Sequence, residues 1–320
     1  MKSLIFSLNI QDARELITAL KSLDVKDDDI YIALPKEVIK NKDDRRLGKV
    51  KLILLIAETP EIIVYSKEVA EVLWQFSKEN DINLILFSAD RLGKEVAAYV
   101  AQLSGVDHLS EAQKLYWTSE GYLGGKRSIL TGKVMADEIL TRRPYIATIA
   151  PKAYTWSELA EEATLLRELN IDIDKHKGMR IIKAEISKEE KINIESAKII
   201  VSVGRGFKKK EDLELAFKLS ELLGGEVGCS RPIAADLKWL SEERWIGLSG
   251  HKVKPDLYIA IGISGQSQHL AGMKDSKVAV AINADKGAPI FSNVDYGVVG
   301  DLYKVLPILI DQLNKKKKTT

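Results

Sequence analysis

Two short loops in the last third of the chain each place an arginine close to glycine or proline. They read VGRG at 203–206 and GCSRP at 228–232. Glycine permits a tight turn and a close approach of the backbone to a ligand, and arginine stacks on planar groups and donates hydrogen bonds in one plane. Arg205 and Arg231 are therefore suited to an anionic or planar ligand. A solvated arginine at a strand-end turn, or a surface salt bridge, explains either loop taken alone.

A third loop, GISGQSQH at 262–269, combines glycine, serine and histidine where a predicted strand passes directly into a helix. The unpaired N–H groups and the positive end of a helix favour an anion such as pyrophosphate. Ser264 and Ser267 add hydroxyl donors, and His269 lies beside the turn. The spacing matches neither GxGxxG nor the Walker motif, so the loop indicates an anion site without assigning it to either class.

Two further polar residues follow the next aliphatic run. Asn283 ends that run and Asp301 begins the last predicted helix. Either side chain can hydrogen-bond a ribose or an adenine edge, and each taken alone is also a common helix cap. Because ligands of parallel α/β sheets bind at the carboxyl ends of the strands, the loops together predict one site large enough for a dinucleotide.

The composition excludes several other kinds of site. The chain has 320 residues, a net charge of +2, one cysteine (Cys229) and four histidines. A single cysteine excludes an internal disulfide and a cysteine-rich metal centre, and the histidines lack metal-ligand spacing. Near-neutral charge argues against a nucleic-acid partner, and no apolar run has the length of a membrane span. We expect a soluble cytoplasmic protein without nucleic acid, membrane insertion, metal or a catalytic nucleophile.

Aliphatic runs alternate with amphipathic stretches in the first half of the chain. Four runs are typical of strands, at 3–8, 30–34, 50–57 and 82–89. The last two are nearly continuous, as a strand buried on both faces requires. Apolar residues at helical spacing predict helices over 67–79 and 92–103. This order predicts a parallel sheet with crossover helices.

A second alternating series begins near residue 198. It predicts strands at 198–203, 256–263 and 277–283, and helices at 212–223 and 301–313. Between the two series, the stretch 157–196 is expected to open as a helix and then becomes rich in charge, with few residues for a core. We therefore predict an α/β fold of two doubly wound parallel-sheet domains, residues 1–190 and 191–320, the second of them Rossmann-like.

The second series also resembles a known family. Its motifs are VGRG at 203–206, CSRP at 229–232, a long run from SGHKVKPDLYIAIGISG to QHLAGMKDS at 249–276, AIN at 281–283 and VDYGVVGDL at 294–302. They make residues 198–313 similar to the FAD domain of the electron transfer flavoprotein α subunit, the FixB family. The first half agrees in pattern, and LILFSADRLGKEVAAYVAQ at 84–102 looks like the family's strand and helix start.

The resemblance implies that the second domain binds one FAD. By position, Arg231 would lie over the isoalloxazine ring, Ser249 would hydrogen-bond flavin N5, and His269 would sit near the N1/O2 edge. The other positions would hold the phosphates, the ribose and the adenosine. The cofactor-binding set that the resemblance implies is Arg205, Ser230, Arg231, Gly247, Leu248, Ser249, Gly250, Ser264, Gly265, Gln266, Ser267, Gln268, His269, Asn283, Asp301 and Leu302.

The same resemblance implies an electron carrier rather than a substrate-converting enzyme. Family members form a heterodimer with a β subunit, accept electrons from a donor dehydrogenase and pass them to a quinone oxidoreductase or a similar acceptor. The first domain would dock the β subunit. A guanidinium and an imidazole at the flavin edge would stabilise an anionic semiquinone. The alternatives are the α subunit of an electron-bifurcating complex and a nucleotide-binding regulatory protein of the same fold without a redox role.

Four residues near the implied flavin position depart from the family pattern. The segment where many relatives carry glutamine, lysine and a further polar residue has Trp245, Ile246, Leu248 and His251 in this chain. Leu248 cannot donate a side-chain hydrogen bond. His251 is an additional residue that would tune the flavin.

Overall fold

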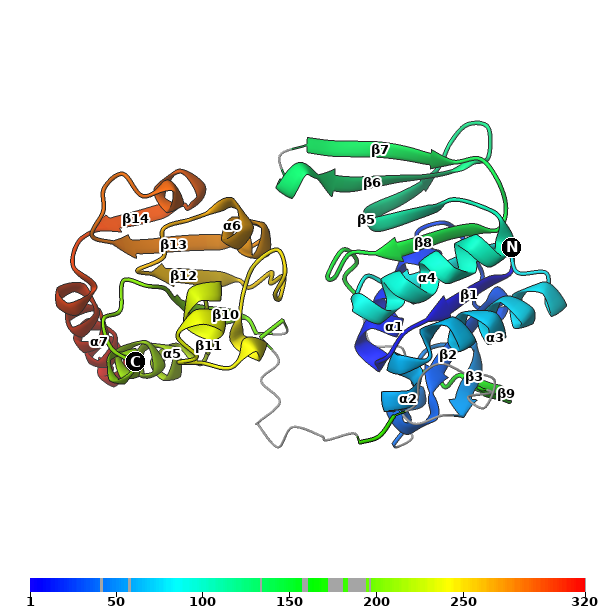
Figure 1. The fold of residues 1–320 in the computed structure, drawn as a ribbon, viewed down its shortest axis with the longest axis horizontal. Coiled ribbons are helices and arrows are strands. Elements are labelled where there is room, and N and C mark those ends of the chain that lie inside the picture. The colour runs from blue at the N-terminus through cyan, green and yellow to red at the C-terminus, as the bar shows by residue number, and fades with distance from the viewer. Residues whose placement is uncertain are drawn as a thin grey trace. The chain divides into compact units, whose positions relative to one another are not determined.

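The computed structural model describes residues 1–40, 43–56, 59–132, 134–156, 161–171, 181–183, 194–195 and 197–319. The chain forms two units, Met1–Ile186 and Ser187–Thr320, which we call unit 1 and unit 2 (Figure 1). The expected boundary between residues 190 and 191 lies outside the described residues. Each unit is described by itself.

Unit 1 is built on a nine-stranded sheet with the order β7-β6-β5-β8-β4-β1-β2-β3-β9. Its parallel strands are β1 (Ser3–Phe6), β2 (Ile30–Pro35), β3 (Lys51–Ile56), β4 (Leu84–Ser88), β8 (Tyr145–Ile149) and β9 (Thr164–Asn170). β1 pairs with β2 on one side and with β4 on the other. The four aliphatic runs of the first half are confirmed as β1 to β4.

Helices cover both faces of this sheet. α1 (Ile10–Lys21) packs on one face, and α2 (Thr59–Val64), α3 (Ser66–Glu79) and α4 (Arg91–Ser104) pack on the other (Figure 1). The helices predicted over 67–79 and 92–103 are confirmed as α3 and α4. This two-sided cover explains why the central strands are apolar on both faces.

An antiparallel part of unit 1 was not predicted. It consists of β5 (His108–Trp117), β6 (Leu123–Ile129) and β7 (Val134–Leu140), which pair in that order, and β5 joins the parallel sheet at β8. Most side chains of β6 and β7 are at least partly exposed, so these strands lack the continuous apolar runs of β1 to β4.

The helix expected from residue 157 is not found in the residues that the structure describes. Residues 157–160 lie outside the described residues, and the chain from Thr164 to Asn170 forms the edge strand β9, paired with β3. The polar run 36–49 contains two short 3₁₀ turns, η2 (Lys36–Val38) and η3 (Asp43–Arg45).

Unit 2 contains a five-stranded parallel sheet with the order β11-β10-β12-β13-β14. The strands are β10 (Ile199–Val203), β11 (Glu226–Cys229), β12 (Leu257–Ile261), β13 (Val278–Asn283) and β14 (Tyr296–Val299). β10 pairs with β11 on one side and β12 on the other, so the chain order reverses there. Such a reversal leaves a crevice at the carboxyl ends of the strands. The predicted two-domain α/β architecture is confirmed.

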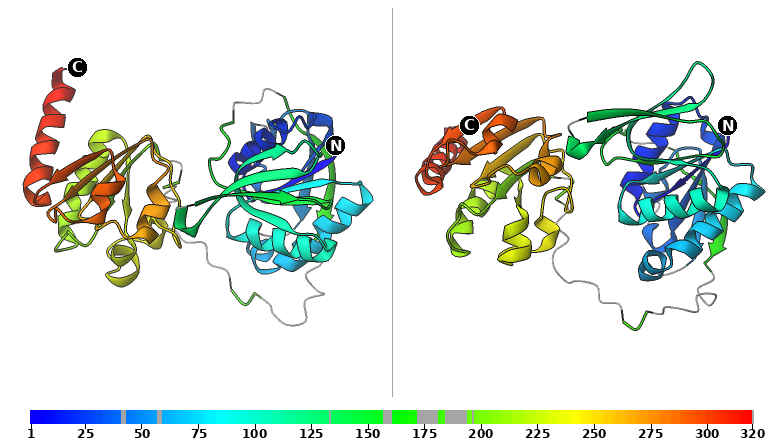
Figure 2. Two further views of the ribbon diagram at one scale, coloured as in Figure 1. Left: turned by 90° about the horizontal axis from the view of Figure 1, so that it is seen from above. Right: turned by 45° about the horizontal axis from the view of Figure 1, so that its top comes forward.

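The helices of unit 2 also cover both faces of its sheet. α5 (Glu214–Leu223) and α7 (Leu302–Thr319) pack on one face and α6 (Ser267–Met273) on the other. The last turns of α7 extend beyond the sheet (Figure 2). Within the described ranges, no helix combines the length and the apolar character needed to cross a membrane.

Candidate functional site

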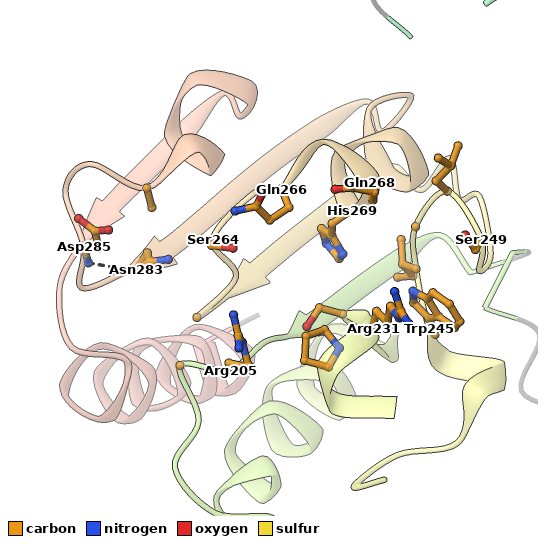
Figure 3. Close-up of a pocket in the computed structure, with 18 residues that line it drawn as sticks. Arg205, Arg231, Trp245, Ser249, Ser264, Gln266, Gln268, His269, Asn283 and Asp285 are labelled. Atoms are coloured by element: carbon orange, nitrogen blue, oxygen red, sulfur yellow. Dashed lines mark hydrogen bonds between the residues drawn. The ribbon is translucent and has the colours of Figure 1, made fainter. Parts of the chain in front are cut away.

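A cavity of about 560 Å³ lies at the carboxyl ends of β10 to β13 in unit 2 (Figure 3). Its size is that of a small-molecule or cofactor site. All four loops selected from the sequence contribute to its wall. The predicted residues that line it are Arg205, Ser230, Arg231, Gly247, Leu248, Ser249, Ser264, Gln266, Gln268, His269 and Asn283.

Glycines allow the loops around the cavity to meet at two points. A Cβ on Gly262, whose φ is +63°, would lie 2.7 Å from the Gly206 Cα, so the loops after β10 and β12 touch backbone to backbone. A Cβ on Gly272 of α6 would lie 2.5 Å from the Gly247 nitrogen. Any larger side chain would separate these segments. The glycines therefore fix the floor of the cavity and the position of α6.

Arg231 and Trp245 lie beside each other at one end of the cavity (Figure 3). The guanidinium carbon is 5.8 Å from the centre of the indole ring, within the range of a cation–π contact. Arg231 directly precedes a π-helical turn, η7 (Pro232–Asp236), whose proline fixes the local backbone. A second cation, Arg205, lines the cavity from the loop after β10. These two charges suit an anionic or electron-rich ligand.

The first turn of α6 borders the cavity at the loop for which the sequence indicates an anion site. Gln266 is the N-cap residue, and its side chain makes no capping hydrogen bond. The first N–H groups of a helix have no partner within the helix. With seven residues, α6 has only a small dipole, so these peptide N–H groups provide most of its attraction for an anion.

His269 is a buried part of the cavity wall, with 7% of its surface exposed. Its Nε2 lies 2.9 Å from the Tyr258 Oη. Its Nδ1 is buried and makes no hydrogen bond of ordinary geometry with any residue the structure describes. Burial lowers the pKa of the imidazole to about 4, and the Ile246 carbonyl offsets part of that shift. The ring is therefore neutral near pH 7, and Nδ1 is a polar atom that a bound group would satisfy.

Asn283 and Asp285 form the opposite end of the cavity (Figure 3). The Asn283 Nδ2 donates to the Ile263 carbonyl at 2.8 Å, and its Oδ1 accepts from the Asp285 N–H at 2.9 Å. This amide therefore ties together the loops that follow β12 and β13. The Asp285 carboxylate accepts from the Gly287 N–H at 2.8 Å and has further capacity to accept from a sugar hydroxyl.

Five residues of the predicted set do not line the cavity: Gly250, Gly265, Ser267, Asp301 and Leu302. Asp301 accepts a hydrogen bond from the Tyr303 N–H at 3.0 Å and so caps α7. Leu302 is 6% exposed and packs in the core below the sheet.

The other three lie beside the cavity and face protein atoms or solvent. Gly250 packs on Trp245 and Gly265 packs on the backbone of Ile290. The exposed Ser267 directs its hydroxyl to the Gln268 side chain at 3.4 Å.

The cavity also contains residues outside the predicted set: Gly206, Pro232, Trp245, Ile246, Gly262, Asp285 and Ala288. Gly206, Pro232 and Gly262 belong to the loops that the sequence indicates as ligand-binding, so their place in the cavity wall could have been predicted. Asp285 follows the end of β13 by two residues, which is also a usable signal. No sequence pattern marks Ala288.

Two other reactive side chains of unit 2 are not in the cavity wall. The His251 Nδ1 lies 2.9 Å from the Glu195 Oε1, and Cys229 is a buried free cysteine. Burial raises the pKa of its thiol to about 12, so no thiolate is present near pH 7. In the part of the chain that the structure describes, no cluster of three or more His, Cys, Asp or Glu side chains could hold a metal ion.

Comparison with known protein families identifies both units. Residues 193–274 match the model of the electron transfer flavoprotein FAD-binding domain. Residues 54–182 match the electron transfer flavoprotein domain. The first match includes the cavity loops from Arg205 to His269.

Individual relatives agree. The chain is 34% identical over 251 residues to the putative electron transfer flavoprotein subunit YdiR of Escherichia coli K12, with 78% of this chain and 79% of that protein covered. It is 34% identical over 270 residues to the electron transfer flavoprotein subunit alpha of Thermoanaerobacterium thermosaccharolyticum, covering 83% and 81%. It is 49% identical over 122 residues to protein FixB of Escherichia coli O139:H28, covering 38% and 39%. The chain therefore belongs to the electron transfer flavoprotein α-subunit (FixB) family and binds FAD.

Proposed function

We propose that this chain is the FAD-carrying α subunit of a heterodimer, accepting electrons from a dehydrogenase and passing them to a quinone oxidoreductase or a similar acceptor. The observation that carries this proposal is the unit 2 cavity, which combines two guanidinium groups, an uncapped helix turn and a buried imidazole. The family membership supports the presence of a second subunit.

Three features of the cavity fit FAD. The glycine contacts leave backbone surface where a pyrophosphate needs close approach. The buried Nδ1 of His269 has no hydrogen-bond partner among the described residues, and a polar group of FAD would supply one. Arg231, stacked on Trp245, lies at one end of the cavity, and the Asn283 amide and the Asp285 carboxylate lie at the other (Figure 3). A long cofactor with an aromatic end and a sugar end requires such an arrangement.

Different residues of the cavity would hold different parts of FAD. Arg231, Ser249 and His269 would hold the flavin ring. Arg205 and the turn 264–268 would hold the pyrophosphate, and the Asn283 end would hold the adenosine. When bound, FAD supplies electron transfer in single steps, and we propose that this site favours the anionic semiquinone form.

The side chains at the ring end support that proposal. The Arg231 guanidinium keeps its charge at any pH the protein meets, and Trp245 orients its plane. Neutral His269 can donate a hydrogen bond without adding a second charge. The Cys229 thiol stays protonated, so it does not compete as a redox group.

We further propose that unit 1 docks the β subunit and that the domain boundary lies near residue 190. The relatives' names describe subunits, which supports an assembly of two chains. Co-purification of this chain with its β subunit and gel filtration of the complex test this proposal. A monomeric chain with a full content of FAD would contradict it.

The sharpest test of the carrier function is Arg231→Ala in the purified heterodimer. The potential of the first one-electron step of the bound flavin should fall, because a fixed positive charge beside the reduced ring is lost. Each tenfold loss of preference corresponds to roughly 60 mV. Arg231→Lys is the matched control, because it keeps the charge and loses the planar stack on Trp245; its potential should lie between the two.

The stoichiometry of flavin decides among the functions. One FAD per heterodimer supports the carrier function. Two FAD and reduction by NADH would indicate a bifurcating complex, and no flavin absorbance with no uptake of added FAD would contradict both. An unchanged potential in Arg231→Ala would remove Arg231 from the role proposed for it.

A further inference from the structure

Tyr258 is a buried polar residue that the proposed function does not use. It is fully buried on β12, on the face of the sheet that α6 covers. Its Oη lies 2.9 Å from the His269 Nε2, and the two rings are 6.3 Å apart at 54°. Tyr258 lies behind the cavity wall, so it meets a ligand only through His269.

The direction of this hydrogen bond follows from the groups around it. The Ile246 backbone carbonyl, which can only accept, lies beside the imidazole. Because Nε2 faces the Tyr258 hydroxyl, we assign this carbonyl to Nδ1. A proton on Nδ1 is attracted to that oxygen, whereas a lone pair there is repelled. In a neutral imidazole the proton is on one nitrogen only. Nε2 is then the acceptor, and the Tyr258 hydroxyl is the donor.

Ser202 supports the same direction from the other side of Tyr258. Its buried Oγ lies beside the Tyr258 Oη without the geometry of a full hydrogen bond. Burial raises the pKa of Tyr258, and the Ser202 hydroxyl acts in the opposite direction, as a donor to Oη does. With Ser202 supplying a proton towards Oη, the tyrosine's own proton is free to point to His269.

We propose that Tyr258 is a positioning residue that sets the tautomer of His269: by donating to Nε2, it keeps the imidazole proton on Nδ1. Nδ1, which makes no hydrogen bond of ordinary geometry with a described residue, then presents an N–H donor instead of a lone pair to a ligand. The consequence for FAD rests on the proposed function, because the electron-rich edge of a flavin accepts hydrogen bonds. The pairing itself is a property of this chain and exists without FAD.

Tyr258→Phe tests the proposal, because it removes the hydroxyl and keeps the ring. In the full-length chain with ¹⁵N-labelled histidine, the ring nitrogen shifts report which nitrogen is protonated, and His269→Gln assigns the signals. We expect a protonated Nδ1 and a bare Nε2 in the wild type. We expect a mixture that includes the Nε2–H form in Tyr258→Phe.

The same variant should bind FAD about tenfold more weakly, equivalent to about 1.4 kcal/mol, with a shifted visible spectrum of the bound flavin. Tyr145→Phe is the matched control. Tyr145 is also a buried tyrosine, and its hydroxyl donates to the Gly121 carbonyl at 3.3 Å in unit 1. This control should change neither the His269 signals nor FAD affinity.

The outcomes separate this proposal from the proposed function. A wild-type His269 protonated on Nε2, or a tautomer that Tyr258→Phe leaves unchanged, overturns the role of Tyr258 whatever FAD does. A chain that shows the expected tautomers and takes up no FAD overturns the carrier function and leaves the pairing standing. If Tyr258→Phe fails to fold, the wild-type spectrum alone decides.

Discussion

The two units share a doubly wound topology and differ at the carboxyl edge of their sheets. In each unit the first strand pairs with strands on both sides, β1 with β2 and β4, and β10 with β11 and β12. In unit 1 the helices that follow β1 and β4 are capped by side chains. The Asn9 Oδ1 accepts from the Asp12 N–H at 2.8 Å, and the Asp90 Oδ1 accepts from the Gly93 N–H at 2.7 Å. In unit 2 the corresponding turn of α6 has no such cap.

The glycine contacts differ in the same way. In unit 1, a Cβ on Gly93 would lie 2.0 Å from the Ser88 carbonyl, so α4 lies directly against the end of β4. In unit 2, the contact between Gly206 and Gly262 joins two loops, and the cavity lies beside it. This topology therefore forms a ligand site where the helix turn is left uncapped and the loops leave room. Topology alone does not create the site.

The largest effects are expected from adding side chains at these glycines. Gly262→Val should separate the loops at the floor of the cavity. A free-energy cost of about 3 kcal/mol, the upper end for overpacking, would weaken FAD binding roughly hundredfold. Gly93→Val should destabilise unit 1 by a similar amount and leave the FAD content of the folded protein unchanged. Flavin absorbance and calorimetry measure both effects. Loss of FAD from the folded Gly93→Val variant would contradict the assignment of Gly93 to the stability of unit 1 and of Gly262 to the FAD site.

The next effect is a dependence of stability on pH that originates in unit 2. The pKa of His269 is about 4 in the folded chain because the ring is buried, against about 6.5 when unfolded. Below pH 6.5 the unfolded chain therefore binds a proton that the folded chain does not. The free energy of unfolding should fall as the pH drops from 6.5 towards 4, by about 2 kcal/mol at pH 5.

Denaturant unfolding between pH 4.5 and pH 7 measures this dependence, and His269→Gln should remove it from unit 2. His108→Gln is the matched control in unit 1, because partial burial also lowers the pKa of His108. An identical pH slope in wild type and His269→Gln would contradict the assignment to His269.

The smallest expected effect comes from giving α6 the side-chain cap that α1 and α4 of unit 1 have. Gln266→Asp should stabilise unit 2 by about 1 kcal/mol and weaken FAD binding about tenfold, because the carboxylate occupies the turn and repels the phosphates. Asn9→Ala, the reciprocal change, should cost about 1 kcal/mol of stability with FAD affinity unchanged. Isothermal titration with FAD and thermal unfolding provide the readouts. An unaltered FAD affinity in Gln266→Asp would show that this turn does not hold the phosphates.

The sequence predicts those parts of the fold that are buried on two faces. The runs that form β3 and β4 are nearly continuously apolar, because the core covers both of their faces. β6, β7 and β9 escaped detection for the opposite reason. The side chains of β7 and β9 are largely exposed and those of β6 are only partly buried, so neither a continuous run nor a strict alternation marks these strands.

Only some residues of the candidate site could be predicted from the sequence. Arg205, Arg231 and the 264–269 turn could be found because parallel strands bring their carboxyl ends together. Asp301 could not be resolved, since one carboxylate can cap a helix or bind a ribose, and the local bond to the Tyr303 N–H decides it. The contact of Trp245 with Arg231 depends on how the chain turns between them, which no spacing rule describes.

The buried Cys229 makes the chain convenient to label. It is the only cysteine in the sequence, and burial keeps its thiol protonated and inaccessible. Maleimide dyes at neutral pH react with exposed thiolates. A cysteine introduced on the surface of each unit would therefore be modified selectively, without first replacing a native residue. Pairs of such dyes would report the distance between unit 1 and unit 2 by energy transfer in single molecules of otherwise unaltered sequence.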